Sequence, residues 1–324
     1  MSEKIENLLG EDRTFDPPSS IVENANATQE WFDLANEDRL AYWQKQALER
    51  ITWYKEPKEI LDDSDAPFYK WFKDGELNLS YNCLDRHLET DGDRIAFYWE
   101  GEPGDSQEIT YQDLYERVCK LSNGLKELGV KKGDRIAIYL GMTPEIVISM
   151  LACARIGAVH SVVFGGFSAE ALADRINDAE AKVVITADGA WRRGDIVPLK
   201  QNVDDSLKLT DHIESVIVVK RTENDVTMVD GRDYWYSELV DKQEADCEPE
   251  VMNAEDMLYI LYTSGTTAKP KGIVHTQAGY LTGVTTTHSA VFDVKEDDIY
   301  WCAADCGWVT GHSYIVYGPL ANKT

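Results

Sequence analysis

Basic residues are scarce in this sequence relative to acidic ones. The 324 residues include 32 Lys and Arg against 58 Asp and Glu, so the formal net charge is −26. Such a chain is expected to bind neither nucleic acid nor an anionic membrane surface, because affinity for a phosphate backbone comes largely from Lys and Arg. The acidic residues are spread along the chain and form no tail. They are typical of a highly soluble surface or, the interpretation we favour, of adaptation to high salt, which screens the self-repulsion.

Cysteine and long apolar runs are also scarce. No CxxC motif occurs, and no Cys/His pair near Cys302 and Cys306 completes a zinc set. The cysteines therefore predict buried thiols, and neither a disulfide framework nor a structural metal site. They are Cys83, Cys119, Cys153, Cys247, Cys302 and Cys306. No run of about eighteen apolar residues occurs and the N-terminus is charged, so we expect no transmembrane helix, no signal peptide and a cytoplasmic location.

The chain divides by composition into three stretches. Residues 1–27 are polar and predict a loose N-terminal arm. Residues 28–90 are rich in Trp and Tyr, whose rings are expected to cover a larger domain. Over 91–324, β-branched runs alternate with helical stretches, which predicts an α/β fold of parallel sheets flanked by helices. The expected strands are 135–141, 158–164, 182–188, 215–220, 257–263 and 299–305.

Three of the expected helices begin with a residue that suits an N-cap. Thr110 precedes the helical stretch YQDLYERV, and Thr143 precedes Pro144, a residue that favours the first helical position. Ser168 precedes AEAL and has Glu170 in the first turn. These caps support the alternation of helices with strands.

Residues 262–272, YTSGTTAKPKG, combine hydroxyls, glycines and lysines in one loop. The expected strand MLYILYT runs into it, and a helix is expected from His275. At a strand–loop–helix junction, backbone N–H groups converge on an anion, and the hydroxyl and ammonium groups add donors. The pattern predicts a polyphosphate cradle in preference to an ordinary Ser/Gly turn. It is not a Walker A loop, because no Gly-Lys-Ser/Thr sequence occurs at the required spacing.

The loop resembles the phosphate loop of the adenylate-forming enzymes. Three further segments are similar to AMP-forming acetyl-CoA synthetases in particular: KWFKDGELNLSYNCLDRHL (70–88), RIGAVHSVVFGGFSAEALADRI (155–176) and WCAADCGWVTGHSYIVYGPLAN (301–322). The resemblance covers nearly all of residues 28–322 and implies the fold of the large N-terminal domain of that superfamily. It also implies a reaction in which acetate and ATP give enzyme-bound acetyl-AMP and pyrophosphate, and the thiol of CoA then displaces AMP.

The resemblance implies three groups of binding residues. The ATP phosphates are expected on Thr263, Ser264, Gly265, Thr266, Thr267, Lys269 and Lys271. CoA is expected on Phe164, Gly165, Gly166, Arg192, Arg193, Gly194, Asp195 and Thr310. The acetate pocket is expected at Val309 and Thr310, where a small apolar wall fits one methyl group and crowds longer acids. Propionyl-CoA synthetases often carry Val at the position of Thr310, so Thr310 favours acetate.

Two positions depart from the family pattern. Ala268 stands where the family usually has Gly, and if that residue needs a positive φ, Ala costs about 1 kcal/mol. Asp195 stands where acetyl-CoA synthetases usually have Lys or Arg, and an acid there is expected to be tolerable mainly in high salt. His160, His275 and His312 are expected to be packed and hydrogen-bonded, since the substrate carboxylate is itself the nucleophile.

The resemblance further implies a C-terminal half beyond Thr324. In the family that half supplies the adenine-binding segment, the Glu that holds Mg²⁺, the Asp that grips the ribose and the Lys that promotes adenylation. We therefore expect no catalytic residue and no metal ligand in this chain, and use of ATP, CoA and Mg²⁺ only together with that half, which could be separately encoded. Three interpretations stay open: an acetate–CoA ligase portion, a portion of a propionyl-CoA synthetase, or a non-catalytic remnant.

Overall fold

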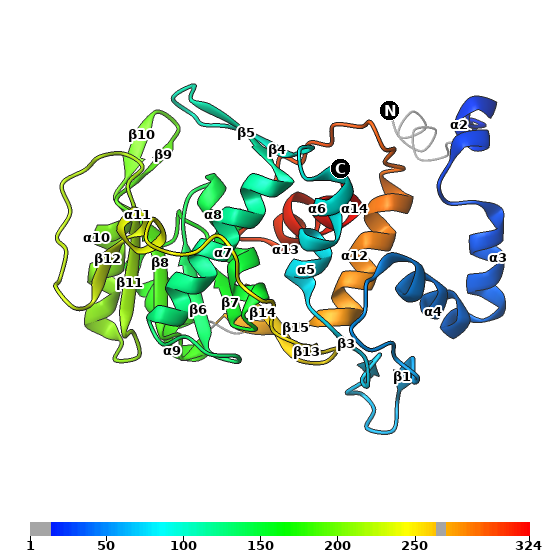
Figure 1. Ribbon diagram of the computed structural model, residues 1–324, viewed down its shortest axis with the longest axis horizontal. Helices are drawn as coiled ribbons and strands as arrows, with labels where there is room; N and C mark the ends of the chain where they lie inside the picture. Colours follow the sequence, from blue (N-terminus) through cyan, green and yellow to red (C-terminus); the bar gives the residue numbers. More distant parts are fainter. Residues whose placement is uncertain (1–13, 264–269) are drawn as a thin grey trace, which may run out of the picture.

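A computed structural model describes residues 14–263 and 270–324 (Figure 1). The largest sheet among these residues has seven strands, in the order β12-β11-β8-β6-β7-β14-β15. Neighbouring strands run parallel except β14 and β15, which are antiparallel. The strands are β6 (Arg135–Tyr139), β7 (Val159–Val162), β8 (Val183–Ala187), β11 (Ser215–Val219), β12 (Asp233–Trp235), β14 (Met257–Thr263) and β15 (Lys271–Thr276).

The central strands suit a sheet that is covered on both faces. β7, β8 and β11 are buried at every position. Val and Ile dominate β8 (VVITA) and β11 (SVIVV), and their branched side chains pack well on a pleated surface. The predicted α/β fold with a mainly parallel sheet is confirmed.

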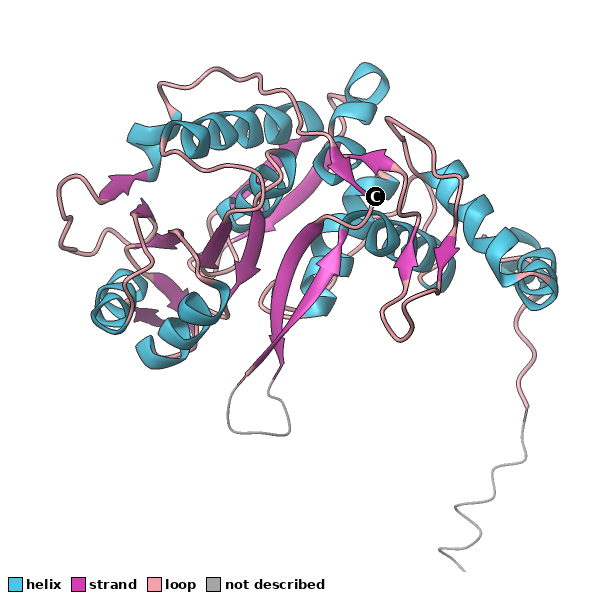
Figure 2. Ribbon diagram, turned by 90° about the horizontal axis from the view of Figure 1, so that it is seen from below, coloured by secondary structure: helices cyan, strands magenta, loops and turns pink. Residues whose placement is uncertain are grey.

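Helices lie above and below these strands in Figure 2. On one side α8 (Pro144–Arg155) packs on β6 and β7 and on α7 (Tyr111–Glu127). α9 (Ala169–Ala179) packs with α10 (Leu199–Ser206), which in turn contacts β8. The remaining elements of this region are β4 (Ile95–Glu100), β5 (Ser106–Thr110), β9 (Ala190–Arg192), β10 (Asp195–Val197), η1 (Leu207–Leu209), α11 (Tyr236–Val240), β13 (Met252–Asn253), α12 (Gln277–Val291), α13 (Val309–Gly311), η2 (His312–Tyr317) and α14 (Gly318–Asn322).

The segment 28–90 lies against α12 at one end of the molecule (Figure 1). α4 and α5 contact α12, and the rings of Trp43, Trp53 and Trp71 pack against the buried core. Before it, α2 has no buried residue. The elements here are α2 (Ser19–Asn24), α3 (Gln29–Glu37), α4 (Arg39–Arg50), β1 (Leu61–Asp62), β2 (Lys70–Trp71), β3 (Glu76–Leu77), α5 (Leu79–Cys83) and α6 (Asp85–Asp91).

The expected helix is present as α12, but the strand–loop–helix junction expected at the hydroxyl-rich loop is wrong. Residues Lys271–Thr276 form β15, which pairs with β14 from Thr263↔Lys271 to Met257↔Thr276, and α12 begins at Gln277. The loop rich in hydroxyls therefore connects two antiparallel strands, β14 and β15, and does not connect a strand to a helix. Ile273, Val274 and Thr276 are β-branched and suit a strand, and pairing with β14 satisfies backbone groups of this run.

The strand expected over 299–305 is also wrong. These residues have no strand structure, and the side chains of Ile299 and Trp301 are 78% and 85% exposed. A strand needs a neighbouring backbone that forms hydrogen bonds with its N–H and C=O groups. Within the described part of the chain, no backbone pairs with this apolar run.

The three expected N-caps all precede helices, but only two make a capping bond. Thr110 accepts a hydrogen bond from the Asp113 N–H at 3.0 Å, and the Asp113 carboxylate accepts from the Thr110 N–H at 3.4 Å, which completes a capping box. The Ser168 hydroxyl accepts from the Ala171 N–H at 3.3 Å. Thr143 makes no such bond, and its buried hydroxyl has no hydrogen-bond partner among the described residues.

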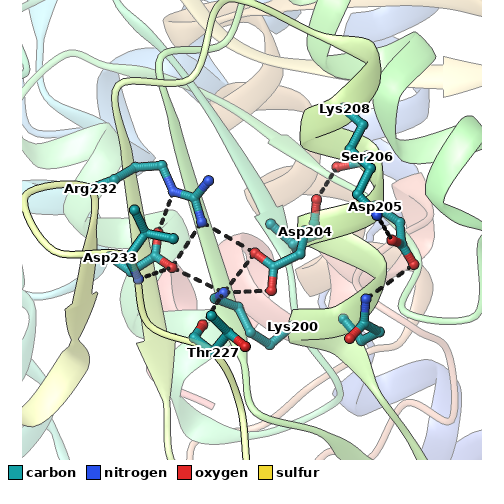
Figure 3. A network of polar contacts seen from close by, with 11 residues as sticks. Lys200, Asp204, Asp205, Ser206, Lys208, Thr227, Arg232 and Asp233 are labelled. Atoms are coloured by element: carbon teal, nitrogen blue, oxygen red, sulfur yellow. Dashed lines mark hydrogen bonds and ion pairs between the residues drawn. The ribbon is translucent and has the colours of Figure 1, made fainter.

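An ion network that sequence reasoning missed fastens the edge strand β12 to α10 (Figure 3). The fully buried Lys200 ammonium donates to both Asp204 carboxylate oxygens, at 2.7 and 2.8 Å, and to the Thr227 carbonyl at 2.7 Å. It also lies 3.0 Å from Oδ2 of Asp233. Burial by itself would raise the pKa of Asp233, but hydrogen bonds from Arg232, the backbone and Lys200 outweigh it and lower that pKa. The buried charges are thus paired and hydrogen-bonded, which is the condition for tolerating them in a core.

The cysteines follow the prediction closely. All are free thiols, and all except the half-buried Cys302 are buried. Burial raises the pKa of the Cys83 thiol to about 12, so it stays protonated. Over the described residues, no helix is long and apolar enough to span a membrane.

Candidate functional site

The central strands end at a cavity of about 390 Å³. Residues 140–143, which follow β6, 164–166, which follow β7, and 190–192, which follow β8, form three of its walls. β7 and β8 lie on opposite sides of β6, so the connections that leave these strands diverge and open a crevice. Ligands of open α/β sheets bind at such a reversal of strand order, outside the carboxyl ends of the strands. The remaining lining residues are Trp99, Glu100, Gly101, Glu102, Val197, Arg221 and Asp305.

The loop after β7 supports an arginine from the next wall. The Arg192 guanidinium lies 4.6 Å above the ring centre of Phe164, a cation–π arrangement. Glycine is needed beneath it, because a Cβ on Gly166 would lie 2.1 Å from Nη1 of Arg192 and 2.6 Å from Cε1 of Phe164. Gly165 is also close to its neighbours, since a Cβ there would lie 3.1 Å from the Leu140 carbonyl oxygen. The structure therefore brings Phe164, Gly165, Gly166 and Arg192 together at the cavity, and their contact with CoA remains a prediction.

Arg193 and Gly194 form the two-residue turn between β9 and β10. Their φ angles are 55° and 83°, as a tight hairpin turn of this type requires. In the described chain the guanidinium groups of Arg192 and Arg193 have no ion-pair partner. In so acidic a protein this leaves two cationic groups available at the rim of the cavity. Gly194 and the exposed Asp195 lie at this turn, beside the cavity and not among its lining residues.

A second arginine, Arg221, also lines the cavity. Arg221 donates to both oxygens of Asp105, at 2.8 and 3.0 Å, and its guanidinium lies 5.1 Å above the Trp99 ring. The Trp99 indole N–H donates to the Met142 carbonyl at 2.9 Å, which ties the β4–β5 hairpin to the loop after β6. Arg221 is therefore engaged, unlike Arg192 and Arg193.

An acidic residue faces Arg192 from the segment before α13. Asp305 lines the cavity, and its Oδ1 accepts a hydrogen bond from the Gly307 N–H at 2.7 Å. Burial raises the pKa of Asp305, an effect that the Gly307 hydrogen bond and the charge of Arg192 only partly offset. The Trp308 ring lies 4.8 Å from the Phe164 ring, so this segment stacks on the loop after β7.

The sequence as a whole matches known families. Residues 84–323 match the model of the AMP-binding enzyme family, and residues 17–83 match that of the acetyl-coenzyme A synthetase N-terminus. This chain belongs to the AMP-binding enzyme family. The resemblance of its motifs is confirmed.

Curated members of the family are similar over almost the whole chain. The acetyl-coenzyme A synthetase of Streptomyces avermitilis is 59% identical over 323 residues, which is 99% of this chain and 49% of the relative. That of Pasteurella multocida is 56% identical over 98% of this chain and 49% of the relative. That of Mycolicibacterium smegmatis is 55% identical over 95% of this chain and 33% of the relative. The chain thus spans about half the length of the first two of these AMP-binding enzymes.

The loop expected to bind the ATP phosphates is described only at its ends. Thr263 and Lys271 face each other as the last pair of the β14–β15 hairpin, and both are exposed. The other loop residues expected to bind phosphate lie outside the described residues: Ser264, Gly265, Thr266, Thr267 and Lys269. Their role remains a prediction.

The two residues expected at the acetate pocket lie apart from the cavity. Val309 and Thr310 begin α13, next to Trp308, and neither lines the cavity. Both are exposed, Val309 at 46%. The expected acetate contact of both residues and the CoA contact of Thr310 remain predictions.

The histidines behave as packed residues of the AMP-binding fold. His160 is buried, and its Nε2 is 2.9 Å from the Tyr317 hydroxyl. His312 is buried with Nδ1 3.1 Å from the Trp308 carbonyl, and the two imidazoles stack at 5.7 Å. Burial lowers the pKa of His312 to about 4 and that of His160 well below its usual value, so both are neutral at pH 7. His275 stacks on Tyr259 at 4.4 Å.

Several lining residues were not anticipated from the sequence, among them Trp99, Arg221 and Asp305. Trp99 and Arg221 come from β4 and from the segment after β11, and Asp305 precedes the motif GWVTGH. Asp305 follows an apolar run and precedes a glycine, which is a usable signal for a loop at a ligand site. Nothing in the local sequence relates Trp99 to Arg221, because 121 residues and several strands separate a hairpin from the central sheet.

Proposed function

We propose that the chain is the N-terminal portion of an AMP-forming acetate–CoA ligase and that the cavity beside Arg192 receives CoA. The whole reaction joins acetate to the α-phosphate of ATP with loss of pyrophosphate. The CoA sulfur then attacks the acetyl carbonyl carbon, the thioester forms, and AMP leaves. The observation that carries the proposal is the cavity itself, which lies at the strand-order reversal and unites the FGG loop with an unpaired arginine.

The residues at the cavity suit a phosphorylated nucleotide. Arg192 is held over Phe164, so its planar fork of donors is oriented before a ligand arrives. A guanidinium that forms no ion pair can make bidentate bonds to phosphate. The Asp305 carboxylate repels an anion near it, although burial raises the pKa of Asp305. We therefore place the phosphates at the Arg192–Arg193 rim and away from Asp305.

For ATP, we propose that residues Thr263 to Lys271 hold the phosphates, and that Val309 and Thr310 form part of the acetate pocket. The described residues contain no group of three or more His, Cys, Asp or Glu side chains that could hold a metal ion. We therefore propose no Mg²⁺ ligand among the described residues.

A C-terminal half, fused or separate, is part of the proposal. The relatives' lengths support it, and so does the exposed apolar surface near α13. Ile299, Trp301, Trp308 and Val309 are all exposed there, Trp301 at 85%. Burying apolar area contributes about 25 cal/mol per Å², so such a surface favours cover by further protein.

The test compares this chain with the protein that contains it and a C-terminal half. Acetate-dependent exchange of pyrophosphate into ATP is expected for the longer protein and not for the chain alone. CoA should bind both, as measured by titration calorimetry. Exchange by the longer protein with propionate far above acetate would move the assignment to a propionyl-CoA synthetase. Exchange with neither acid, together with no CoA binding, would favour a non-catalytic remnant.

A further inference from the structure

The turn between β9 and β10 holds a carboxylate of the same chain. The backbone N–H of Arg193 donates to Oε2 of Glu102 at 3.0 Å, and the N–H of Gly194 donates to Oε1 of the same carboxylate. Both donors belong to a turn whose two residues have positive φ angles. Two convergent N–H groups of this kind make a concavity that binds anions. Glu102 occupies it with one oxygen on each donor.

The segment that carries Glu102 is fastened in place. It is the connection between β4 and β5, and Asp105 in the same connection forms the two-bond ion pair with Arg221. Gly101 lets this connection close, because a Cβ there would lie 2.1 Å from Oδ1 of Asp105 and 2.6 Å from Nη2 of Arg221. Glu102, which also lines the cavity, is thus held beside the turn.

The concavity is better matched to a phosphate than to Glu102. The peptide bond that carries the first of these N–H groups joins Arg192 to Arg193. Neither guanidinium pairs with a carboxylate in the described chain. A phosphate monoester carries more charge than a carboxylate and has three terminal oxygens, so it can use both N–H groups and a guanidinium together. Glu102 uses the N–H groups alone. It is also exposed, so it can move into solvent without loss of core packing.

We propose that Glu102 is a placeholder that a phosphate monoester of the ligand must displace from the Arg193–Gly194 turn. The inference rests on the proposed CoA site, whose ligand ends in such a monoester on the ribose. Glu102 therefore sets the preference of the site between the phosphorylated and the unphosphorylated nucleotide. While the Glu102 carboxylate accepts from the two N–H groups of the turn, the site disfavours a second anion. When the carboxylate is removed, these N–H groups are free to bind a phosphate.

The test is Glu102→Gln, with Glu108→Gln as the matched control. Glu108 is exposed on β5 of the same hairpin and makes no contact with the turn, so its variant removes the same charge without emptying the seat. Titration calorimetry at one fixed KCl concentration measures the affinities of CoA, dephospho-CoA and inorganic phosphate. We expect Glu102→Gln to bind CoA about tenfold more tightly, which corresponds to about 1.4 kcal/mol. Dephospho-CoA should bind within about twofold of the unchanged chain, and Glu108→Gln should change neither affinity.

Each outcome decides between the two proposals. CoA binding that Glu102→Gln leaves within about twofold would overturn the placeholder while the CoA site stands. An equal gain for CoA and dephospho-CoA would also overturn it, since general charge repulsion explains that result. A gain for inorganic phosphate comparable to the gain for CoA would support an open anion seat. No CoA binding to any of the three proteins would overturn the CoA site, and the placeholder with it.

Discussion

Replacing Gly166 by Ala is expected to disable the cavity without changing its charge. The new methyl group would begin 2.1 Å from Nη1 of Arg192 and 2.6 Å from Cε1 of Phe164, and atoms this close must separate. The guanidinium is the end of a flexible side chain, so it should leave the Phe164 ring first. Its cation–π contact at an exposed site contributes about 0.5–1 kcal/mol, and its displacement should cost little in folding stability.

The larger loss falls on ligand binding. A hydrogen bond to a charged group contributes about 1.5–3 kcal/mol, and exposure reduces this toward the lower limit. One misplaced guanidinium should therefore weaken CoA binding about tenfold. The assay is titration calorimetry with CoA, together with a thermal melt that shows whether the variant is folded.

Gly283→Ala is the matched control. A Cβ on Gly283, within α12, would meet no atom within 4 Å, and Ala in place of Gly in a helix stabilises by about 0.5–1 kcal/mol. This variant should raise the melting temperature and leave CoA affinity unchanged. A folded Gly166→Ala protein that binds CoA as tightly as the original would refute the role of the Arg192–Phe164 arrangement.

Further predictions concern the core, pH, salt and the phosphate loop. Lys200→Met leaves Asp233 and Asp204 without their buried partner and should cost about 3–5 kcal/mol in urea unfolding; a change under about 1 kcal/mol would contradict the network's role. Below about pH 6.5 the unfolded chain protonates His160 and His312 while the folded chain does not, so stability should fall from about pH 7 toward 4, by about 1.4 kcal/mol per unit of pKa lowering. A flat profile from about pH 7 to 5 would count against this. Molar KCl should raise the melting temperature, because it screens the charge of −26, and equal melting temperatures in dilute buffer would argue against salt adaptation. In the longer protein, Lys269→Ala should raise the activation free energy of exchange by about 2–4 kcal/mol with acetate and propionate alike. Thr310→Val should instead change the ratio of the exchange rates with the two acids, by about 1–3 kcal/mol in activation free energy. The reverse pattern would show that the two roles are misassigned.

The parts of the fold that could be predicted are those with a local cause. The runs VVITA and SVIVV are continuous, apolar and β-branched, and they form buried strands as expected. Thr110 and Ser168 cap helices because the acceptor and its N–H are three residues apart. Such signals need no knowledge of the distant chain.

The parts that could not be predicted depend on distant pairing. β15 forms because β14 lies beside it, and the equally apolar residues 299–305 form no strand because no described backbone does the same for them. At the candidate site, the glycines and Arg192 were expected from motifs, whereas Glu102 reaches its partners across 91 and 92 residues. Its local sequence, EGEPGD, indicates only a turn.

Hydrogen exchange measured by mass spectrometry with and without CoA tests the central claim most directly, because it locates the ligand on the chain. If CoA occupies the cavity at the ends of β6, β7 and β8, exchange should slow in peptides that contain 140–143, 164–166 and 190–194. It should stay unchanged in peptides from α3 and α4, at the far end of the molecule (Figure 1). Protection confined to other segments, or no protection at CoA concentrations that saturate binding, would contradict the account.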